Sequence, residues 1–270
     1  MIIFKSINKL NKEVNFKADT GFVPTMGALH RGHISLIKRA KTESSKVIVS
    51  IFVNPSQFNK SNDFKKYPRN INKDLIILKK LKVDFVLIPS AKDIFKNQRS
   101  MKIKISKNDK VLCAKFRPGH FEGVLGVINQ FLKKIQSKRI YLGEKDFQQI
   151  YLIKKFIKNK FKTKILSCST VRDKNNLALS SRNILLNNKD IKKSSFIANL
   201  LIKFKKRIQK NISNKKELNN IINKINNIKK IKVEYLEIRN KNNLSKNYKK
   251  NNFKIFLAYY NKKVRLIDNY

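Results

Sequence analysis

The chain of 270 residues contains 63 lysine and arginine residues against 17 aspartate and glutamate residues, a formal net charge of +46, and 41% of its residues are hydrophobic. This length and hydrophobic content suffice for two packed domains, and no apolar stretch approaches the ~20 residues of a membrane span. Two cysteines are too few for a disulfide scaffold, and the first residues lack the apolar core and cleavage site of a signal peptide, so we expect a cytoplasmic protein.

The positive charge by itself suggests a protein that binds nucleic acid or an anionic membrane. The excess is spread over the whole chain, however, together with abundant asparagine and isoleucine. No basic stripe interleaved with aromatic residues stands apart from this background. We therefore expect no specific nucleic-acid partner and no membrane association.

Short β-branched runs alternate with amphipathic stretches through the first two thirds of the chain. The pattern predicts strands at 22–26 and 47–53, with a helix over 34–40 between them. It continues with a helix over 71–82, a strand at 83–88, a helix over 121–136, a strand at 139–142, a helix over 146–159 and a strand at 163–167. This alternation is typical of an α/β fold with a Rossmann-like, doubly wound parallel sheet, whose ligands bind at the carboxyl ends of the strands.

The chain changes character beyond residue 172. Two Lys- and Asn-rich helices are predicted at about 187–211 and 215–229, followed by strand-like segments at 232–238 and 253–267. We therefore predict a Rossmann-like domain over 1–172 and a smaller α+β domain over 173–270.

All three histidines lie in two short segments that also contain glycine. In the first, His30 and His33 bracket Gly32 where a predicted strand gives way to a helix. Imidazoles at a helix N-terminus can donate hydrogen bonds to phosphate oxygens, and the glycines permit close approach of a nucleotide. The His-x-Gly-His pattern alone is also compatible with two surface histidines in a turn.

Polar residues elsewhere extend this interpretation. Two hydroxyls and a guanidinium at Ser180, Ser181 and Arg182 suit triphosphate oxygens, although Ser-Ser-Arg-Asn is also a plausible helix cap. Paired with the upstream His-x-Gly-His, this segment indicates an adenylate-forming nucleotidyltransferase.

Two further segments follow predicted strands at the ligand edge of the sheet. The amides of Asn54, Gln57 and Gln149 can bind the hydroxyls and the carboxylate of a small polar acid, and Lys145 can bind phosphate. Gln148 is expected on a solvated helix face.

Together these segments resemble the pantoate–β-alanine ligase family, with matches in order over nearly the whole chain. The matching segments are 24–33, 52–58, 67–69, 117–124, 143–149, 179–183 and 265–269. The chain departs from the family pattern at Leu179, where methionine is common, and at 174–176, which lacks the glycine often found there. Lys73 and Ile77 replace polar residues sometimes found beside Asp74.

The resemblance implies an AMP-forming carbon–nitrogen ligase that condenses D-pantoate with β-alanine through a pantoyl adenylate, releasing pyrophosphate. It implies ATP binding by Pro24, Met26, Gly27, His30, Gly32, His33, Gly143, Lys145, Asp146, Val171, Leu179, Ser180, Ser181 and Arg182. Of these, His33, His30, Lys145 and Arg182 would be catalytic. Pantoate would contact Gln57, Gln149, Asn54 and Arg117, and Asp74 would lie near Mg²⁺. The family also implies a homodimer in which the second domain acts as a lid.

Three other interpretations remain open at this stage. A nucleotidyltransferase acting on another small acid or phosphate would share the His-x-Gly-His pattern. Within that class, an enzyme that joins a nucleotide to a phosphorylated alcohol has no need of Gln57 and Gln149. A tRNA synthetase fragment would need an anticodon-reading domain, for which the roughly 100 residues after the second motif are few. A basic nucleic-acid-binding protein leaves the placement of the three histidines unexplained.

Overall fold

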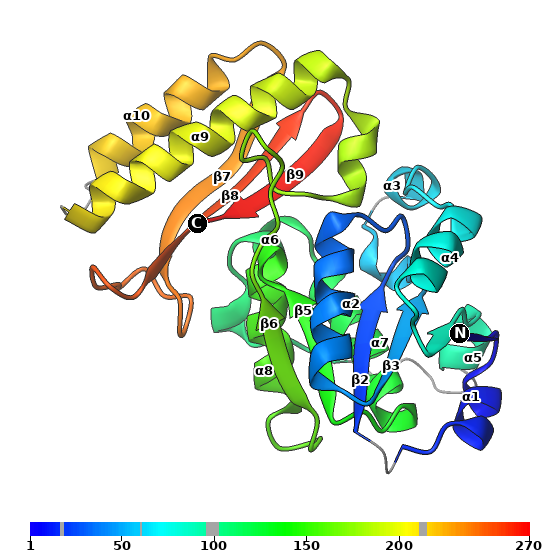
Figure 1. The fold of residues 1–270 in the computed structure, drawn as a ribbon. Coiled ribbons are helices and arrows are strands. Elements are labelled where there is room, and N and C mark those ends of the chain that lie inside the picture. Colours follow the sequence, from blue (N-terminus) through cyan, green and yellow to red (C-terminus); the bar gives the residue numbers. More distant parts are fainter. Residues whose placement is uncertain (17–18, 60, 96–102, 211–214) are drawn as a thin grey trace. The chain divides into compact units, whose positions relative to one another are not determined.

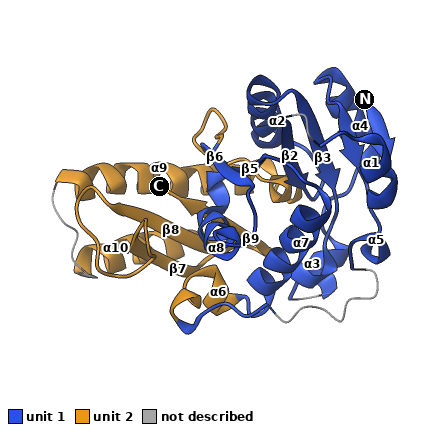
Figure 2. Ribbon diagram, turned by 90° about the horizontal axis from the view of Figure 1, so that it is seen from below, with its two compact units in different colours: residues 1–107, 117–170 blue, residues 108–116, 171–270 orange. Residues whose placement is uncertain are grey.

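The computed structural model describes residues 1–16, 19–59, 61–95, 103–210 and 215–270. These form two compact units, shown in different colours in Figure 2. Unit 1 comprises residues 1–107 and 117–170, and unit 2 comprises residues 108–116 and 171–270.

The division differs from the predicted one in the position of the boundary and in one earlier segment. The sequence predicts one boundary at 172/173, whereas the chain changes unit at 170/171 and residues 108–116 also group with unit 2. One contact of this segment joins residues far apart in the chain: the Cys113 Sγ lies 3.0 Å from the hydroxyl oxygen of Tyr235. No local sequence pattern indicates such a contact, so chain order alone does not group the segment with unit 2.

Unit 1 is built on a six-stranded sheet whose paired strands are all parallel, in the order β1-β4-β3-β2-β5-β6. The strands are β1 (Ile2–Phe4), β2 (Thr20–Thr25), β3 (Lys46–Ile51), β4 (Phe85–Leu87), β5 (Arg139–Gly143) and β6 (Lys164–Cys168). The predicted α/β fold with a parallel sheet is confirmed. The sequence predicts neither β1 nor the helix after it, because β1 has three residues and two of them are exposed.

Helices connect these strands and cover both faces of the sheet (Figure 1). They are α1 (Ile7–Glu13), α2 (Arg31–Glu43), α3 (Ser61–Lys65), α4 (Ile71–Lys80), α5 (Ala91–Phe95), α7 (His120–Lys134) and α8 (Phe147–Ile157). On one face Ile37 of α2 packs in a buried cluster with Val23 and Val47. On the other, Phe131 of α7 lies edge-on to Phe22 of β2, with ring centroids 5.3 Å apart. Successive residues of β2 therefore point to opposite, equally apolar faces.

The strand order creates a switch point between β2 and β5. From β2 the chain proceeds to β3 and β4 on one side, whereas β5 is followed by β6 on the other. The loops after β2 and β5 thus leave the same edge of the sheet in opposite directions, and open α/β sheets bind their ligands at such a point. His30 and His33 follow β2, and Lys145 follows β5.

Unit 2 contains the antiparallel sheet β7-β8-β9, formed by β7 (Ile231–Asn240), β8 (Phe253–Asn261) and β9 (Val264–Asn269). Its helices are the short α6 (Cys113–Phe116) and the longer α9 (Asn188–Lys210) and α10 (Lys215–Asn226). Helices α9 and α10 cover one face of the sheet (Figure 1), and their buried residues share one cluster with those of the strands.

Two predicted elements of unit 2 differ in detail. The strand-like run 253–267 is two strands, because the chain turns back at Lys262, whose φ is +54°. The first predicted helix corresponds to α9, but its predicted end at residue 211 lies outside the described residues. Within those residues, no helix is both long and apolar enough to cross a membrane.

Candidate active site

The two histidines of the first motif cap helix α2 and bond to each other's backbone. His30 is the N-cap residue, and its Nδ1 accepts the backbone N–H of Gly32 at 3.1 Å. His33 is the third residue of the helix, and its Nδ1 accepts the backbone N–H of His30 at 3.3 Å. The rings stand 4.1 Å apart between centroids. This reciprocal capping box fixes both side chains against the helix start.

The capping bonds determine which nitrogen of each imidazole holds the proton. Because Nδ1 of both rings accepts a hydrogen bond, the neutral imidazole holds its proton on Nε2. Burial, reinforced by the positive charge of Lys145, lowers the pKa of His30 from 6.5 to about 4. Burial, together with His30 and Lys145, lowers the pKa of His33 to about 3. Near neutral pH the site therefore presents two uncharged Nε2–H donors beside a helix N-terminus.

A buried carboxylate shapes the loop between β2 and these histidines. Asp74 of α4 accepts the backbone N–H of Ala28 at 2.9 Å through Oδ2 and that of Leu29 at 2.7 Å through Oδ1. Gly27 and Ala28 have φ values of +75° and +50°, so successive N–H groups face the carboxylate. Glycine is required at 27, because a Cβ there would lie 2.9 Å from Asp74 Oδ2.

The sequence does not predict this role of Asp74, which the family resemblance instead matches to a magnesium position. Its side chain is buried, with 2% of the residue exposed. Burial raises the pKa of the carboxyl group, and the hydrogen bonds from the backbone of Leu29 and Ala28, which lower that pKa, offset only part of the rise. The described residues contain no group of three or more His, Cys, Asp or Glu side chains that could hold a metal ion. The arrangement fits a carboxylate that holds the loop, and direct contact with Mg²⁺ stays a prediction.

The loop after β5 places positive charge beside the imidazoles. The Nζ of Lys145 lies 3.7 Å from Asp146 Oδ1. The positive charge of Lys145 contributes to the lowered pKa of both His30 and His33. Gln149 is half-buried at the start of α8 (Phe147–Ile157). The expectation for Gln148 was wrong: the residue is 6% exposed and so does not lie on a solvated helix face.

Of the predicted pantoate residues, Gln57 ends the 3₁₀ turn Pro55–Gln57 that follows β3, and Asn54 is the N-cap residue of that turn. Asn54 is 1% exposed, and its Nδ2 donates to the carbonyl of Gly123 at 3.1 Å. Its Oδ1 accepts the backbone N–H of Ser56 at 3.2 Å and the Ser56 hydroxyl at 2.8 Å. Both ends of the Asn54 amide therefore hold the turn, and its contact with pantoate stays a prediction.

Arg117 and His120 support the same turn from the start of α7. His120 Nδ1 lies 2.7 Å from the carbonyl oxygen of Gln57, and Arg117 Nη2 donates to that oxygen at 3.1 Å. Since a carbonyl can only accept, His120 donates from Nδ1, and its Nε2 accepts from Arg117 Nη1 at 3.0 Å. His120 has no role predicted from the sequence, although the rarity of histidine and the glycine-bearing segment around it are signals that it belongs to the site.

Gly123 provides the close packing that this support requires. We expect Gly123→Ala to lower the free energy of unfolding by about 1 to 3 kcal/mol, because it overfills a packed contact. A Cβ at this position would lie 2.3 Å from the backbone carbonyl oxygen of Ser56. Urea unfolding measures the change.

Gly126→Ala is the matched control, in the same helix. A Cβ at Gly126 meets no atom within 4 Å, so alanine should be neutral or add up to ~1 kcal/mol of helix propensity. Equal stabilities of the two variants would contradict the packing argument.

The predicted triphosphate residues belong to unit 2. Ser180 caps the 3₁₀ turn Ser181–Leu185, and its Oγ accepts the backbone N–H of Arg182 at 3.3 Å. The alternative interpretation of this segment as a helix cap is thus seen directly for Ser180. Ser181 is buried, while Val171, Leu179 and Arg182 are half-buried. Their contacts with ATP stay predictions.

Unit 1 brings most of the predicted site residues to one sheet edge. The residues at the carboxyl ends of β2, β3 and β5, in the loops after them or in the first turn of the helices that follow are Pro24, Met26, Gly27, His30, Gly32, His33, Asn54, Gln57, Gly143, Lys145, Asp146 and Gln149. Arg117 joins this group through its bond to Gln57. The grouping lies at the switch point of the sheet, where open α/β sheets bind their ligands.

Comparison with known proteins places this arrangement in a family. The family model described as "Pantoate-beta-alanine ligase" matches residues 2–270. A pantothenate synthetase from Francisella tularensis subsp. mediasiatica is 44% identical over 268 residues, which cover 98% of this chain and 94% of the relative. A pantothenate synthetase from Francisella philomiragia is also 44% identical, covering 100% of this chain and 97% of the relative.

Solved structures agree over the whole chain. The pantothenate synthetase from Thermus thermophilus superimposes with a TM-score of 0.93 at 29% identity and covers 100% of this chain and 99% of its own. The pantoate–β-alanine ligase from Francisella tularensis gives a TM-score of 0.86 at 42% identity, covering 100% of this chain and 97% of its own. That structure is described as a complex with "Beta-gamma ATP" and β-alanine.

Proposed function

Because the chain belongs to the pantoate–β-alanine ligase family, it is an ATP-dependent carbon–nitrogen ligase that joins pantoate to β-alanine, and we propose how its residues perform the reaction. The observation that supports the proposal most strongly is the pair of neutral imidazoles on the N-terminus of α2, beside Lys145, at the switch point of the sheet. Phosphate groups bind at such helix starts, where backbone N–H groups and the helix dipole favour negative charge.

The first step would activate the acid. An oxygen of the pantoate carboxylate attacks the α-phosphorus of ATP, and the bond from that phosphorus to the bridging oxygen of the β-phosphate breaks. The products are pantoyl adenylate and pyrophosphate. The Nε2–H groups of His30 and His33 would donate to phosphate oxygens as negative charge develops on them, and Lys145 would add a positive charge nearby. Such donors are already oriented by the fold, so the transition state needs little reorganisation.

The second step would form the amide. The amine of β-alanine attacks the carbonyl carbon of the adenylate, the bond from that carbon to the phosphate oxygen breaks, and AMP leaves. The nitrogen then loses a proton to give pantothenate. Enclosure of the adenylate would protect it from water between the steps.

Pantoate would lie beside the turn that follows β3. Gln57 and Gln149 would bind its hydroxyls and carboxylate, with Asn54 and Arg117 near the same pocket. Arg117 and His120 already hold the backbone of Gln57. We therefore propose that these two residues position the Gln57 amide for the substrate.

ATP would use residues of both units. Gly143, Lys145 and Asp146 would contact ribose and phosphates, and Val171 would contact adenine. Leu179, Ser180, Ser181 and Arg182 would face the triphosphate and the leaving pyrophosphate. Arg182 would thereby act catalytically, and unit 2 would act as the lid.

Mg²⁺ would offset the charge of the triphosphate when it is bound. Since Asp74 uses both carboxylate oxygens to hold the 27–29 loop, we propose that the ion is held mainly by phosphate oxygens and water. The homodimer, the cytoplasmic location and the lack of a specific nucleic-acid partner stay predictions.

The test is exchange of labelled pyrophosphate into ATP, with Mg²⁺ but without β-alanine, at moderate salt. Because adenylation alone regenerates ATP from pyrophosphate, we expect exchange only when D-pantoate is present. Exchange that needs a different small acid would instead favour the alternative, a nucleotidyltransferase of the His-x-Gly-His type with another acceptor. No exchange from a folded chain would overturn the proposed adenylation.

A further inference from the structure

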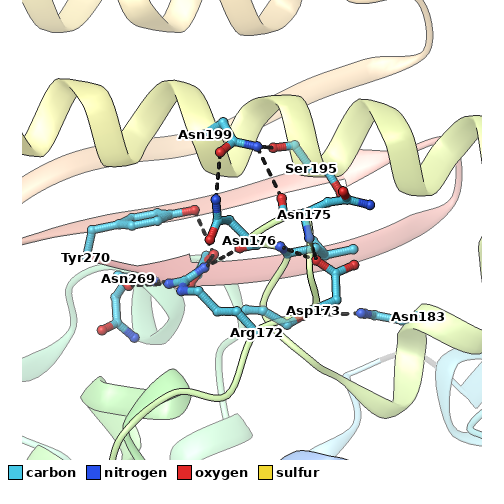
Figure 3. A network of polar contacts seen from close by, with 12 residues as sticks. Arg172, Asp173, Asn175, Asn176, Asn183, Ser195, Asn199, Asn269 and Tyr270 are labelled. Carbon is cyan, nitrogen blue, oxygen red and sulfur yellow. Dashed lines mark hydrogen bonds and ion pairs between the residues drawn. The ribbon is translucent and has the colours of Figure 1, made fainter.

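A tight turn at residues 172–178 of unit 2 immediately precedes the predicted triphosphate segment. Arg172 and Ala178 form an isolated antiparallel bridge, and the backbone N–H of Asp173 donates to the Leu177 carbonyl at 2.9 Å. The Asp173 carboxylate accepts the backbone N–H groups of Asn175 at 2.8 Å and Leu177 at 2.9 Å. The turn is therefore closed by its own hydrogen bonds, as Figure 3 shows.

The turn is continuous with the segment that follows it. The backbone N–H of Leu179 donates to the carbonyl of Val171 at 3.0 Å. The Asn183 Nδ2, at the far end of the segment, donates to the carbonyl of Ala178 at 3.2 Å. A displacement of the turn would therefore move residues 179–183 with it.

Arg172, at the start of the turn, is hydrogen-bonded to residues of β9. Its guanidinium donates two hydrogen bonds to Asp268, from Nη1 at 2.7 Å and from Nη2 at 2.8 Å. Nη2 also donates to the carbonyl of Asn269 at 3.1 Å, and the guanidinium carbon lies 4.6 Å from the centroid of the Tyr270 ring. The Tyr270 hydroxyl completes the group by donating to Asp268 at 2.7 Å.

Asn176 attaches the tip of the turn to α9. Its φ of +69° is one that glycine adopts freely and asparagine tolerates. Unlike glycine, it has a side chain, and its Nδ2 donates to Asn199 Oδ1 at 2.8 Å. Asn199 Nδ2 in turn donates to the carbonyls of Asn175 at 3.1 Å and Ser195 at 2.9 Å. The two amides thus form a clamp between the turn and the helix (Figure 3).

We propose that Asn176 and Asn199 are positioning residues for ATP. Together with Arg172 they fix the turn at both its base and its tip, and so set the place of Ser180, Ser181 and Arg182 before the nucleotide arrives. The inference rests on the proposed function, in which these three residues bind the triphosphate. Asparagine at 176 replaces the conformational freedom of glycine with a side-chain bond, which lowers the entropy that ATP must remove on binding.

Asn176→Gly tests the clamp, because glycine keeps the φ of the turn and removes only the side chain. We expect the KM for ATP in pyrophosphate exchange to rise about 3- to 10-fold, the equivalent of one hydrogen bond, while the KM for pantoate stays unchanged. Asn175→Gly is the control, since it introduces the same residue one position earlier. Within the described part of the chain, the Asn175 side chain makes no hydrogen bond. The KM of the Asn175→Gly variant for ATP should therefore stay near the wild-type value.

A merely structural role would reduce the active fraction and lower the rate with all KM values unchanged, which would overturn the inference. Asn199→Ala should raise the KM for ATP at least as much, and adding Asn176→Gly to it should cause no further rise. Additive effects would show that the two amides do not act as a pair.

If wild-type exchange depends on pantoate but Asn176→Gly leaves the KM for ATP unchanged, this inference alone fails. If the wild-type chain shows no such exchange, the proposed function fails and the inference with it.

Discussion

His33→Ala is expected to lower the rate of pantoate-dependent pyrophosphate exchange by ~10²- to 10³-fold, the usual cost of removing one preorganised donor from a transition state. The variant loses the Nε2–H group that would bond a phosphate oxygen. It also loses the Nδ1 that accepts the His30 backbone N–H, which should cost about 1 kcal/mol of stability. Exchange rates at saturating ATP and pantoate, with urea unfolding in parallel, measure both losses.

His33→Gln separates the two roles of this residue. Glutamine at the third helical position can accept the N-cap backbone N–H, as it does in capping boxes, so most of the stability should return. Its amide N–H is not held in place by a rigid ring as the imidazole Nε2–H is, so the exchange rate should stay well below that of the wild type. Exchange near the wild-type rate in either variant would exclude the proposed role of His33.

Asp74→Ala is expected to lower the free energy of unfolding by about 2 to 6 kcal/mol, because two buried N–H groups, those of Ala28 and Leu29, lose their acceptor. The loop that they form includes two residues with positive φ and should lose its shape. Exchange activity should fall with it, since His30 follows this loop directly. Urea unfolding gives the change in stability, and Lys73→Ala, on an exposed neighbour, is the control.

Asp74→Asn distinguishes a loop-holding carboxylate from a metal ligand. The amide retains one acceptor oxygen, so the variant should fold, with a smaller loss of stability than alanine causes. If Asp74 only holds the loop, the Mg²⁺ concentration that gives half-maximal exchange should match that of the wild type. A clear rise in that concentration would support the magnesium position that the family resemblance implies.

The sheet and the first part of the site could be predicted from the sequence because their signals are local. The apolar run 47–53 has a length typical of a buried strand, and the amphipathic run 34–40 has helical spacing. Parallel strands place their carboxyl ends at one edge, so the order of elements already groups His30 with Lys145 and Gln57.

The supporting contacts could not be predicted because they join residues that are far apart in the chain. Asp74 bonds Leu29 across 45 positions, and His120 bonds Gln57 across 63. Gln148 was placed on the wrong face because a polar residue in a helix is exposed more often than not, and only tertiary packing overrides that preference. The grouping of residues 108–116 with unit 2 also depends on residues that are far apart in the chain.

The reciprocal capping of His30 and His33 makes the chemistry of this site inseparable from its folding. Each imidazole that would donate to a phosphate also accepts a backbone N–H at the start of α2. His33 accepts that of His30, and His30 accepts that of Gly32. Loss of either ring therefore affects the helix start as well as the phosphate donor, unless the new side chain accepts the same backbone N–H. Tuning of the rate during evolution or engineering should thus occur at residues such as Lys145, which acts on the pair through its charge and takes no part in the cap.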